Sequence, residues 1–231
     1  MTPTIHLFDI DGTLLDGDGA GRRAMETAFA QCVGEAATAG LRALRFAGMT
    51  DPAIVRAGLR AAAIAADDDA RHIAAVIARY LELLPSCIAE AARFRAHDGV
   101  LAVLDALRGA AEVAIGLGTG NVEPGARLKL TPLGIGDRFA FGGYGSDHED
   151  RAELIAIAAA RGAAQLGRPR SACRVVVIGD TPKDIAAAQA IGAESLAVAT
   201  SFYDAAALRA AGATLAVQDL AQPEALAFLR G

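Results

Sequence analysis

Two aspartates separated by one residue follow the first apolar segment of the chain. They belong to the run Phe8-Asp9-Ile10-Asp11-Gly12-Thr13, in which Gly12 permits a sharp turn. If the backbone stays extended, residues two apart point to the same side, so the carboxylates of Asp9 and Asp11 face one crevice. Buried carboxylates cost free energy unless a cation or hydrogen bonds compensate them, so this pair suggests a metal site. A solvated acidic turn is the alternative interpretation.

A second polar segment follows another apolar run. The residues Leu117-Gly118-Thr119-Gly120-Asn121 combine a hydroxyl, two glycines and the expected start of a helix. Helix N-termini and glycine-containing turns bind anions through backbone N–H groups, so this segment predicts a cradle for an anion. The alternative is that Asn121 only caps the following helix.

A third segment, Ile178-Gly179-Asp180-Thr181-Pro182-Lys183-Asp184, ends an apolar run in one acid and places a second acid four residues later. Pro182 suits the first turn of a helix. Asp180 and Asp184 can then both face the crevice. The alternative is that Thr181 caps the helix and Asp184 is a favourable first-turn acid.

Six short apolar runs are interpreted as buried strands, at residues 5–10, 113–117, 139–141, 175–178, 196–199 and 215–217. Helical patterns lie between them, at residues 100–107, 123–133, 149–161, 183–191 and 205–211. Continuous apolar strands alternating with helices are typical of a sheet covered on both faces, so we predict an α/β fold with a Rossmann-like parallel sheet. The carboxyl ends of such strands meet at one edge, where the three polar segments are expected to converge.

One interval interrupts this alternation. Residues 16–95 contain no convincing strand, and helical patterns occur at 21–33, 51–65, 68–83 and 85–95. We therefore expect an all-α subdomain at residues 16–95, inserted into an α/β core formed by residues 1–15 and 96–231.

Composition argues against several classes of partner. The 231 residues carry a formal net charge of −5 without a basic cluster, so nucleic-acid binding is not expected. The chain has no run of about 18 bulky apolar residues, so we expect no membrane span. Its N-terminal residues lack a basic region followed by an apolar run, so we expect no secretory signal. The three cysteines are far apart, which fits reduced thiols in a cytoplasmic protein.

The acids are informative as a group. Asp9, Asp11 and Asp180 would repel one another in a single crevice without a hard cation, and carboxylate oxygens suit Mg²⁺. Mg²⁺ beside an anion cradle is typical of phosphoryl transfer. One carboxylate can attack phosphorus and form an aspartyl-phosphate, and a neighbouring acid can protonate the leaving alcohol and later deprotonate water.

These segments resemble the motifs of the haloacid dehalogenase superfamily, in its phosphoglycolate-phosphatase-like branch. The run at residues 9–13 is similar to the first motif, Thr119 and the strand before it to the second, and residues 179–184 to the fourth. The helical insert resembles the cap that relatives carry between the first and second motifs, which closes over the site and selects the substrate.

The resemblance implies Asp9 as the nucleophile and Asp11 as the general acid and base. The residues expected to bind phosphate are Thr119, Gly120, Asn121 and Thr13. The expected Mg²⁺ ligands are the Asp9 carboxylate, the Asp11 backbone carbonyl and Asp180, with Asp184 as a further ligand or a support.

The third motif departs from the family pattern. Relatives usually carry a lysine where the helix before the fourth motif begins, whereas this chain reads Ser146-Asp147-His148-Glu149-Asp150-Arg151. We assign Arg151 the role of balancing charge on Asp9 and phosphate, although its planar fork needs a different geometry from lysine. Lys129 is the alternative, and His148 is expected in a polar loop or helix cap.

The sequence therefore predicts a Mg²⁺-dependent phosphatase that hydrolyses a small phosphorylated metabolite, a phosphomonoester. The alternatives are a phosphomutase of the same superfamily, a metal-independent haloacid dehalogenase and a non-catalytic binding module. Asp11 argues against the dehalogenase, because those relatives lack this second acid, and the cost of clustered buried carboxylates argues against the binding module. Candidate substrate contacts in the insert are Arg22, Arg23, Gly48, Met49 and Thr50, with exposed helix positions as the alternative for the two arginines.

Overall fold

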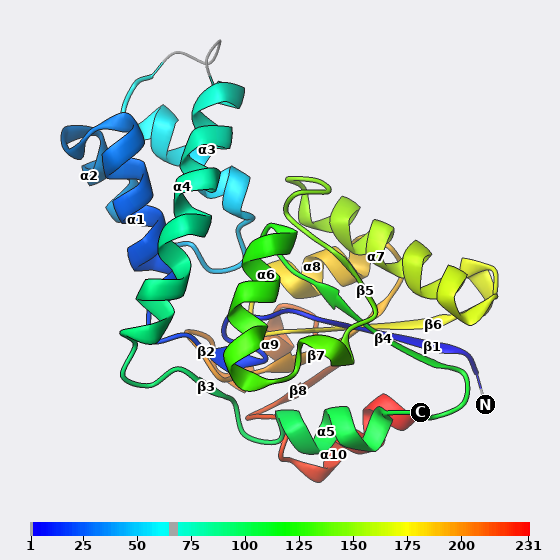
Figure 1. Cartoon of the computed structure of the whole chain (residues 1–231). Helices are drawn as coiled ribbons and strands as arrows, with labels where there is room; N and C mark the ends of the chain where they lie inside the picture. The colour runs from blue at the N-terminus through cyan, green and yellow to red at the C-terminus, as the bar shows by residue number, and fades with distance from the viewer. Residues whose placement is uncertain (1, 65–68) are drawn as a thin grey trace.

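A six-stranded parallel sheet forms the centre of the protein. The computed structural model describes residues 2–64 and 69–231. The strands stand in the order β5-β4-β1-β6-β7-β8 (Figure 1). Their bounds are β1 Thr4–Phe8, β4 Val113–Gly118, β5 Phe141–Gly143, β6 Arg174–Gly179, β7 Glu194–Val198 and β8 Leu215–Val217. The predicted α/β fold with a parallel sheet is confirmed.

The direction in which strands are added reverses at β1. Strands β4 and β5 lie on one side of β1, and β6, β7 and β8 lie on the other. Phe8, at the carboxyl end of β1, is in register with Leu117 of β4 and Ile178 of β6. Ligand sites in open α/β sheets lie where the strand order reverses, at the carboxyl ends. The register therefore brings the segments that follow β1, β4 and β6 to one edge of the sheet.

Helices cover both faces of the sheet (Figure 1). Helices α5 (Val100–Leu107) and α10 (Pro223–Arg230) lie on one face, and α7 (Arg151–Leu166) and α8 (Pro182–Ala190) lie on the other. Alternate residues of β1 serve the two layers, because side chains of a strand alternate between faces. Phe8 packs with α5 and α10, whereas Ile5 and Leu7 pack with α7 and α8. Helices α6 (Glu123–Leu130) and α9 (Ala205–Ala210) complete the connections.

Four helices between β1 and β4 share an apolar cluster of their own and stand to one side of the sheet (Figure 1). They are α1 Ala20–Val33, α2 Thr38–Arg42, α3 Asp51–Ala61 and α4 Asp69–Ala89. A short antiparallel pair, β2 (Leu15–Asp16) with β3 (Arg95–Ala96), joins the two ends of this segment. These two-residue strands were not expected, because they are too short to produce a sequence pattern. We refer to residues 16–95 as the cap, and this extent remains our proposal.

Most predicted elements differ from the structure by a few residues at their ends, and two of the differences change the assignment of a segment. The separate helix predicted at 85–95 is wrong, since α4 continues through Pro85 to Ala89, with Leu84 and Ile88 extending its buried face. Strand β5 begins at Phe141 rather than at 139. Phe139 instead packs its ring edge-on against Phe8, with 6.1 Å between ring centroids. The predicted helix limits at Ala65 and Asp68 lie outside the described residues.

Among the described residues, α4 has the length and apolar character of a membrane span, with a mean hydropathy of 1.3 over 18 residues. This differs from the expectation that the chain contains no membrane span, because short side chains contribute to the hydropathy of α4. Val76, Tyr80 and Leu84 of α4 are buried in the cap cluster, where α4 packs on α1. A helix packed inside a globular subdomain also meets these criteria, so they are weak evidence for a membrane span.

A histidine is buried in the central strand. His6 of β1 is fully buried, and neither ring nitrogen has a hydrogen-bond partner among the described residues. Burial, and secondarily the nearby Arg174 guanidinium, lowers the pKa of His6 to about 4. The folded protein therefore contains neutral imidazole at pH values where the unfolded chain binds a proton.

This difference predicts a loss of stability in acid. The stabilisation is present above the ordinary histidine pKa of about 6.5 and is lost as pH falls from there toward 4, because the unfolded state binds more protons. Between pH 7 and pH 4.5, the wild type should lose about 2 kcal/mol more unfolding free energy than His6→Phe. Urea unfolding at both pH values measures this difference. Substitution of the exposed His148 by Asn is the control and should follow the wild type; an equal loss in His6→Phe would contradict the prediction.

Candidate active site

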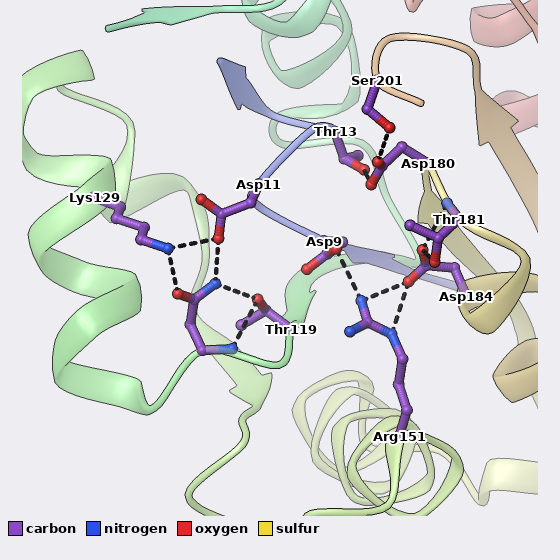
Figure 2. A network of polar contacts seen from close by, with 11 residues as sticks. Asp9, Asp11, Thr13, Thr119, Lys129, Arg151, Asp180, Thr181, Asp184 and Ser201 are labelled. Carbon is purple, nitrogen blue, oxygen red and sulfur yellow. Dashed lines mark hydrogen bonds and ion pairs between the residues drawn. The ribbon is translucent and has the colours of Figure 1, made fainter. Parts of the chain in front are cut away.

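Three buried aspartates meet at the carboxyl edge of the sheet (Figure 2). Asp9 follows β1, Asp180 follows β6, and Asp184 lies in the first turn of α8. One carboxylate oxygen from each lies within 4.8 Å of the others. The sequence placed Asp9 and Asp180 in one crevice, and the structure brings them together there.

Close backbone approach and two hydroxyls fix Asp180. Gly12 has a φ of +79°, and a Cβ at this position would lie 2.5 Å from Asp180 Oδ2, so a side chain is excluded on both grounds. The Thr13 hydroxyl donates to Asp180 Oδ1 at 3.1 Å, and the Ser201 hydroxyl donates to Oδ2. Thr13 therefore supports Asp180 in this structure.

Asp184 is held by the helix that it begins. Its Oδ2 accepts hydrogen bonds from the Thr181 N–H and hydroxyl, at 3.0 and 2.7 Å, and completes a capping box at the start of α8. Its Oδ1 accepts from Arg151 Nε at 2.8 Å. The helix-capping alternative and the site interpretation therefore both apply to Asp184.

Arg151 is the cation that contacts the aspartate cluster. It is the first residue of α7, whose N-cap is Asp150, and it is 9% exposed. Its Nη2 lies 2.9 Å from Asp9 Oδ2 and 2.5 Å from Asp184 Oδ1 (Figure 2). This is the geometry expected for the assignment of Arg151 rather than Lys129 to Asp9.

The cluster holds more negative than positive charge. Burial raises the pKa of Asp9 to about 6, although the Arg151 guanidinium opposes the shift. Burial, with repulsion from Asp184 and Asp9, raises the pKa of Asp180 to about 8. One guanidinium thus faces three carboxylates, and a divalent cation would remove the excess. Carboxylate oxygens are the donors that Mg²⁺ prefers, so the residues present fit this ion.

Asp11 belongs to a different set of contacts. Its Oδ2 accepts from Lys129 Nζ at 2.6 Å and from Asn121 Nδ2 at 2.8 Å. Burial alone would raise the pKa of Asp11, but the charge and hydrogen bonds of Lys129 and Asn121 outweigh burial and lower it. The Asp11 side chain is therefore separate from the aspartate cluster, and only its backbone carbonyl remains a predicted metal ligand.

The expected anion cradle after β4 is largely occupied by protein groups. The Asn121 N–H donates to Thr119 Oγ1, the Val122 N–H to Asp51, and the Glu123 N–H to Ser146. Among the described residues, the Gly120 N–H has no hydrogen-bond partner. Most N–H groups of the expected anion cradle are therefore already bonded to protein groups, and the Gly120 N–H remains for an anion.

The cap docks directly on this turn. The Asp51 N–H donates to the Gly120 carbonyl at 2.8 Å, and the Asp51 carboxylate accepts from the Val122 N–H at 2.9 Å. A Cβ at Gly120 would lie 2.3 Å from the Met49 carbonyl oxygen, which explains the glycine. The Thr50 hydroxyl donates to the Glu149 carbonyl, and burial raises the pKa of Asp51 to about 6.

A cavity of about 730 Å³ lies between the cap and the core. The predicted site residues of the core that line it are Asp9, Asp11, Gly120, Asn121, Lys129, Arg151 and Asp180. Thr13 and Thr119 are buried outside this lining, so their contact with phosphate stays a prediction.

The predicted cap contacts are divided in the same way. Arg22, Gly48 and Met49 line the cavity, whereas Arg23 and Thr50 do not. Arg22 is already paired with Glu26 at 3.1 Å and lies over the Phe46 ring at 4.1 Å. Arg23 donates to the Asp18 carbonyl at 2.6 Å instead.

Three residues of the site were missed from the sequence. Ser201 follows β7, so the rule that site residues follow parallel strands could have found it. Asp51 and Tyr80 of the cap line the cavity, but their positions depend on how the cap packs. For these two residues the sequence contains no comparable signal.

The family comparison agrees with the geometry. The family model described as haloacid dehalogenase-like hydrolase matches residues 5–192. No curated protein gives a significant match to the chain.

Solved structures share the fold. A hydrolase from Pseudomonas syringae is 22% identical, with a TM-score of 0.68, over 96% of this chain and 95% of its own. CbbY from Rhodobacter sphaeroides, in complex with phosphate, is 19% identical, with a TM-score of 0.70, over 100% of both chains. The β-phosphoglucomutase from Clostridium difficile is 17% identical, with a TM-score of 0.67, over 99% of this chain and 97% of its own. At these identities the likeness establishes the fold alone.

The charge excess gives a stability test that needs no substrate. In EDTA at pH 8, Asp180→Asn should raise the free energy of unfolding by about 2 kcal/mol, because it removes a poorly compensated buried charge. Mg²⁺ should raise the Tm of the wild type and should not raise that of the variant, because only the wild type keeps the binding carboxylate. Differential scanning calorimetry with and without Mg²⁺ measures both effects.

Asp98→Asn is the matched control, since its side chain is 77% exposed and lies outside the cavity. This control should respond to Mg²⁺ as the wild type does. A wild type whose Tm is unchanged by Mg²⁺ would rule out the metal site.

Proposed function

This chain belongs to the haloacid dehalogenase-like hydrolase family, and on that premise we propose that it is a Mg²⁺-dependent phosphatase. The proposed reaction hydrolyses a small phosphomonoester through an aspartyl-phosphate on Asp9. The observation that carries the proposal is the position of Asp9, which lines the cavity, contacts Arg151 at 2.9 Å and belongs to the carboxylate cluster.

Asp9 and Asp180 are the proposed carboxylate ligands of Mg²⁺. Asp184 already accepts hydrogen bonds on both oxygens, so we assign it the role of holding Arg151 and α8 in place. When bound, Mg²⁺ supplies positive charge that offsets the carboxylates and the phosphoryl oxygens.

In the first step, an Asp9 oxygen attacks phosphorus, and the bond from phosphorus to the leaving oxygen breaks. Arg151 is fixed by Asp184 and can stabilise the negative charge of the transferring group without rearranging. Asp11 lines the same cavity and, in its protonated form, donates a proton to the departing oxygen.

In the second step, water attacks the same phosphorus and the bond to Asp9 breaks. The Asp11 carboxylate accepts the proton of this water. Lys129 and Asn121 favour this carboxylate form by hydrogen bonding to Oδ2. The products are the alcohol and inorganic phosphate, and Asp9 is regenerated.

The cap limits the substrate to a small phosphorylated metabolite, in our proposal. Ile54 and Tyr80 of the cap form part of the wall of the cavity of about 730 Å³. Contacts of Asp51 with Gly120 and Val122 hold the cap on the core, which excludes water during the transfer. The cytoplasmic location remains a prediction.

A phosphomutase is the alternative, since a cap acid in the cavity could serve the second half of an isomerisation. Asp51 is such an acid, but its carboxylate accepts the Val122 N–H at 2.9 Å and is engaged in cap docking. Hydrolysis therefore explains the geometry better. The presence of Asp11, which pairs with Lys129, likewise favours phosphoryl transfer, because the metal-independent dehalogenases lack this second acid.

The proposal predicts hydrolysis of p-nitrophenyl phosphate that depends on Mg²⁺ and on Asp9. Asp9→Asn should lower kcat at least about 10³-fold, because the amide is not a nucleophile. Release of p-nitrophenol with Mg²⁺ or with EDTA measures this loss. The proposal is wrong if the wild type has no activity in Mg²⁺ or if the Asp9→Asn variant keeps full activity.

Two further measurements separate the alternatives. Asp98→Asn should keep wild-type activity, which excludes a general effect of removing a carboxylate. Release of inorganic phosphate equal to release of alcohol identifies hydrolysis. Return of the phosphoryl group to another hydroxyl of the same substrate would identify a mutase.

A further inference from the structure

A second buried cation lies on the cavity wall, away from the aspartate cluster. The Lys129 side chain is 6% exposed, and its Nζ lies 2.6 Å from Asp11 Oδ2 and 2.6 Å from Asn121 Oδ1. The neighbouring Arg127, on the same helix, is 67% exposed and pairs with Glu123 on the surface. Lys129 is thus directed into the protein, where an ammonium group is costly unless it is paired.

The two buried cations have separate partners. Arg151 contacts Asp9 and Asp184, and Lys129 contacts Asp11. Among the described residues, no ion pair joins Lys129 to the aspartate cluster. Lys129 therefore adds little to charge balance at the nucleophile, and its effect is directed to Asp11.

The contacts on Asp11 are all made by one oxygen. Oδ2 accepts from both Lys129 and Asn121, whereas Oδ1 accepts no hydrogen bond from a described residue. Lys129 also donates to Oδ1 of the Asn121 amide, so the three side chains form a closed ring of hydrogen bonds. This ring fixes one oxygen of Asp11 and leaves the other available to a substrate or water in the cavity.

The cap completes the surroundings of Lys129. The Tyr80 hydroxyl of α4 and the Asp51 carboxylate interact electrostatically with the ammonium. Gly21 of α1 is also close, since a Cβ there would lie 3.1 Å from Lys129 Nζ. Lys129 therefore pairs with Asp11 of the core and lies close to α1 and α4 of the cap.

We propose that Lys129 is a positioning residue, which holds Asp11 in its working orientation and does so when the cap is closed over it. The inference rests on the proposed phosphatase function and adds a role that the motifs do not assign. Lys129 itself transfers no group. It acts through Asp11, and the cap residue Tyr80 acts through Lys129.

A double-mutant cycle tests this dependence. Lys129→Met should lower kcat for p-nitrophenyl phosphate about 100-fold, because loss of the anchor misplaces Asp11, with KM changed less than about threefold. In the Asp11→Asn background, the same substitution should change kcat less than about threefold, since the group it positions is already removed. Equal fold-losses in both backgrounds would show a general structural role and would overturn the inference.

Two additional variants guard against misfolding and test the cap. Arg127→Met, on the exposed face of the same helix, should behave as the wild type. Tyr80→Phe removes only the hydroxyl over Lys129 and should lower kcat by about 3- to 10-fold in the wild type, and by less than about twofold in Asp11→Asn. Should Lys129→Met fail to fold, by circular dichroism, this Tyr80 cycle decides the inference with the same criterion.

The outcomes distinguish this inference from the function on which it rests. If the wild type has no Asp9-dependent hydrolysis, the proposed function fails and the inference fails with it. If hydrolysis depends on Asp9, but Lys129→Met lowers kcat by the same factor in the wild type and in Asp11→Asn, the proposed function stands and the role of Lys129 is overturned.

Discussion

Compensation of buried negative charge is the constraint on which the rest of the structure depends. The ends of β1 and β6 bring Asp9 and Asp180 beside Asp184, with Arg151 as the guanidinium in contact. An uncompensated charge in the protein interior costs several kcal/mol. The protein holds this arrangement with a capping box at α8 and with hydroxyls that bind the carboxylates. Such an arrangement is useful to a protein that binds a cation there, and it is a liability to one that does not.

The two buried cations, Arg151 and Lys129, lie on either side of the turn that follows β4 (Figure 2). Arg151 begins α7 on the core side and contacts Asp9, the proposed nucleophile, whereas Lys129 of α6 contacts Asp11. The turn after β4 connects the core to the cap, because Gly120 and Val122 bind the Asp51 backbone and carboxylate of the cap. Groups that a helix end would offer to an anion are thereby used to hold the cap closed. The same short segment therefore contacts both the cap, through Gly120 and Val122, and Asp11, through Asn121.

Much of the site was predictable because parallel strands end at a common edge. That rule, with apolar runs before Asp9 and Asp180, was sufficient to place these two acids together. The helix that contains Arg151 was also predicted, because an apolar pattern follows this residue. Its start was placed at Glu149, two residues early, whereas Asp150 is the N-cap and Arg151 the first residue. The surroundings of Lys129 could not be predicted, because helical spacing places a residue on one face of a helix and does not determine which segment packs against that face. Tyr80 and Gly21 cover it, and they belong to a subdomain whose packing is not written in a local pattern. At Pro85 the sequence predicted a break between two helices. The structure has one continuous helix there, because Leu84 and Ile88 of α4 are both packed in the cap.

The proposed divalent cation would bind between the segments that follow β1 and β6. Anomalous diffraction from crystals soaked in Mn²⁺, a substitute for Mg²⁺ with oxygen ligands, locates such an ion. We expect one strong peak about 2 Å from carboxylate oxygens of both Asp9 and Asp180. If no peak lies at this position while the carboxylates are ordered as described, no cation binds there and the proposed metal site is wrong.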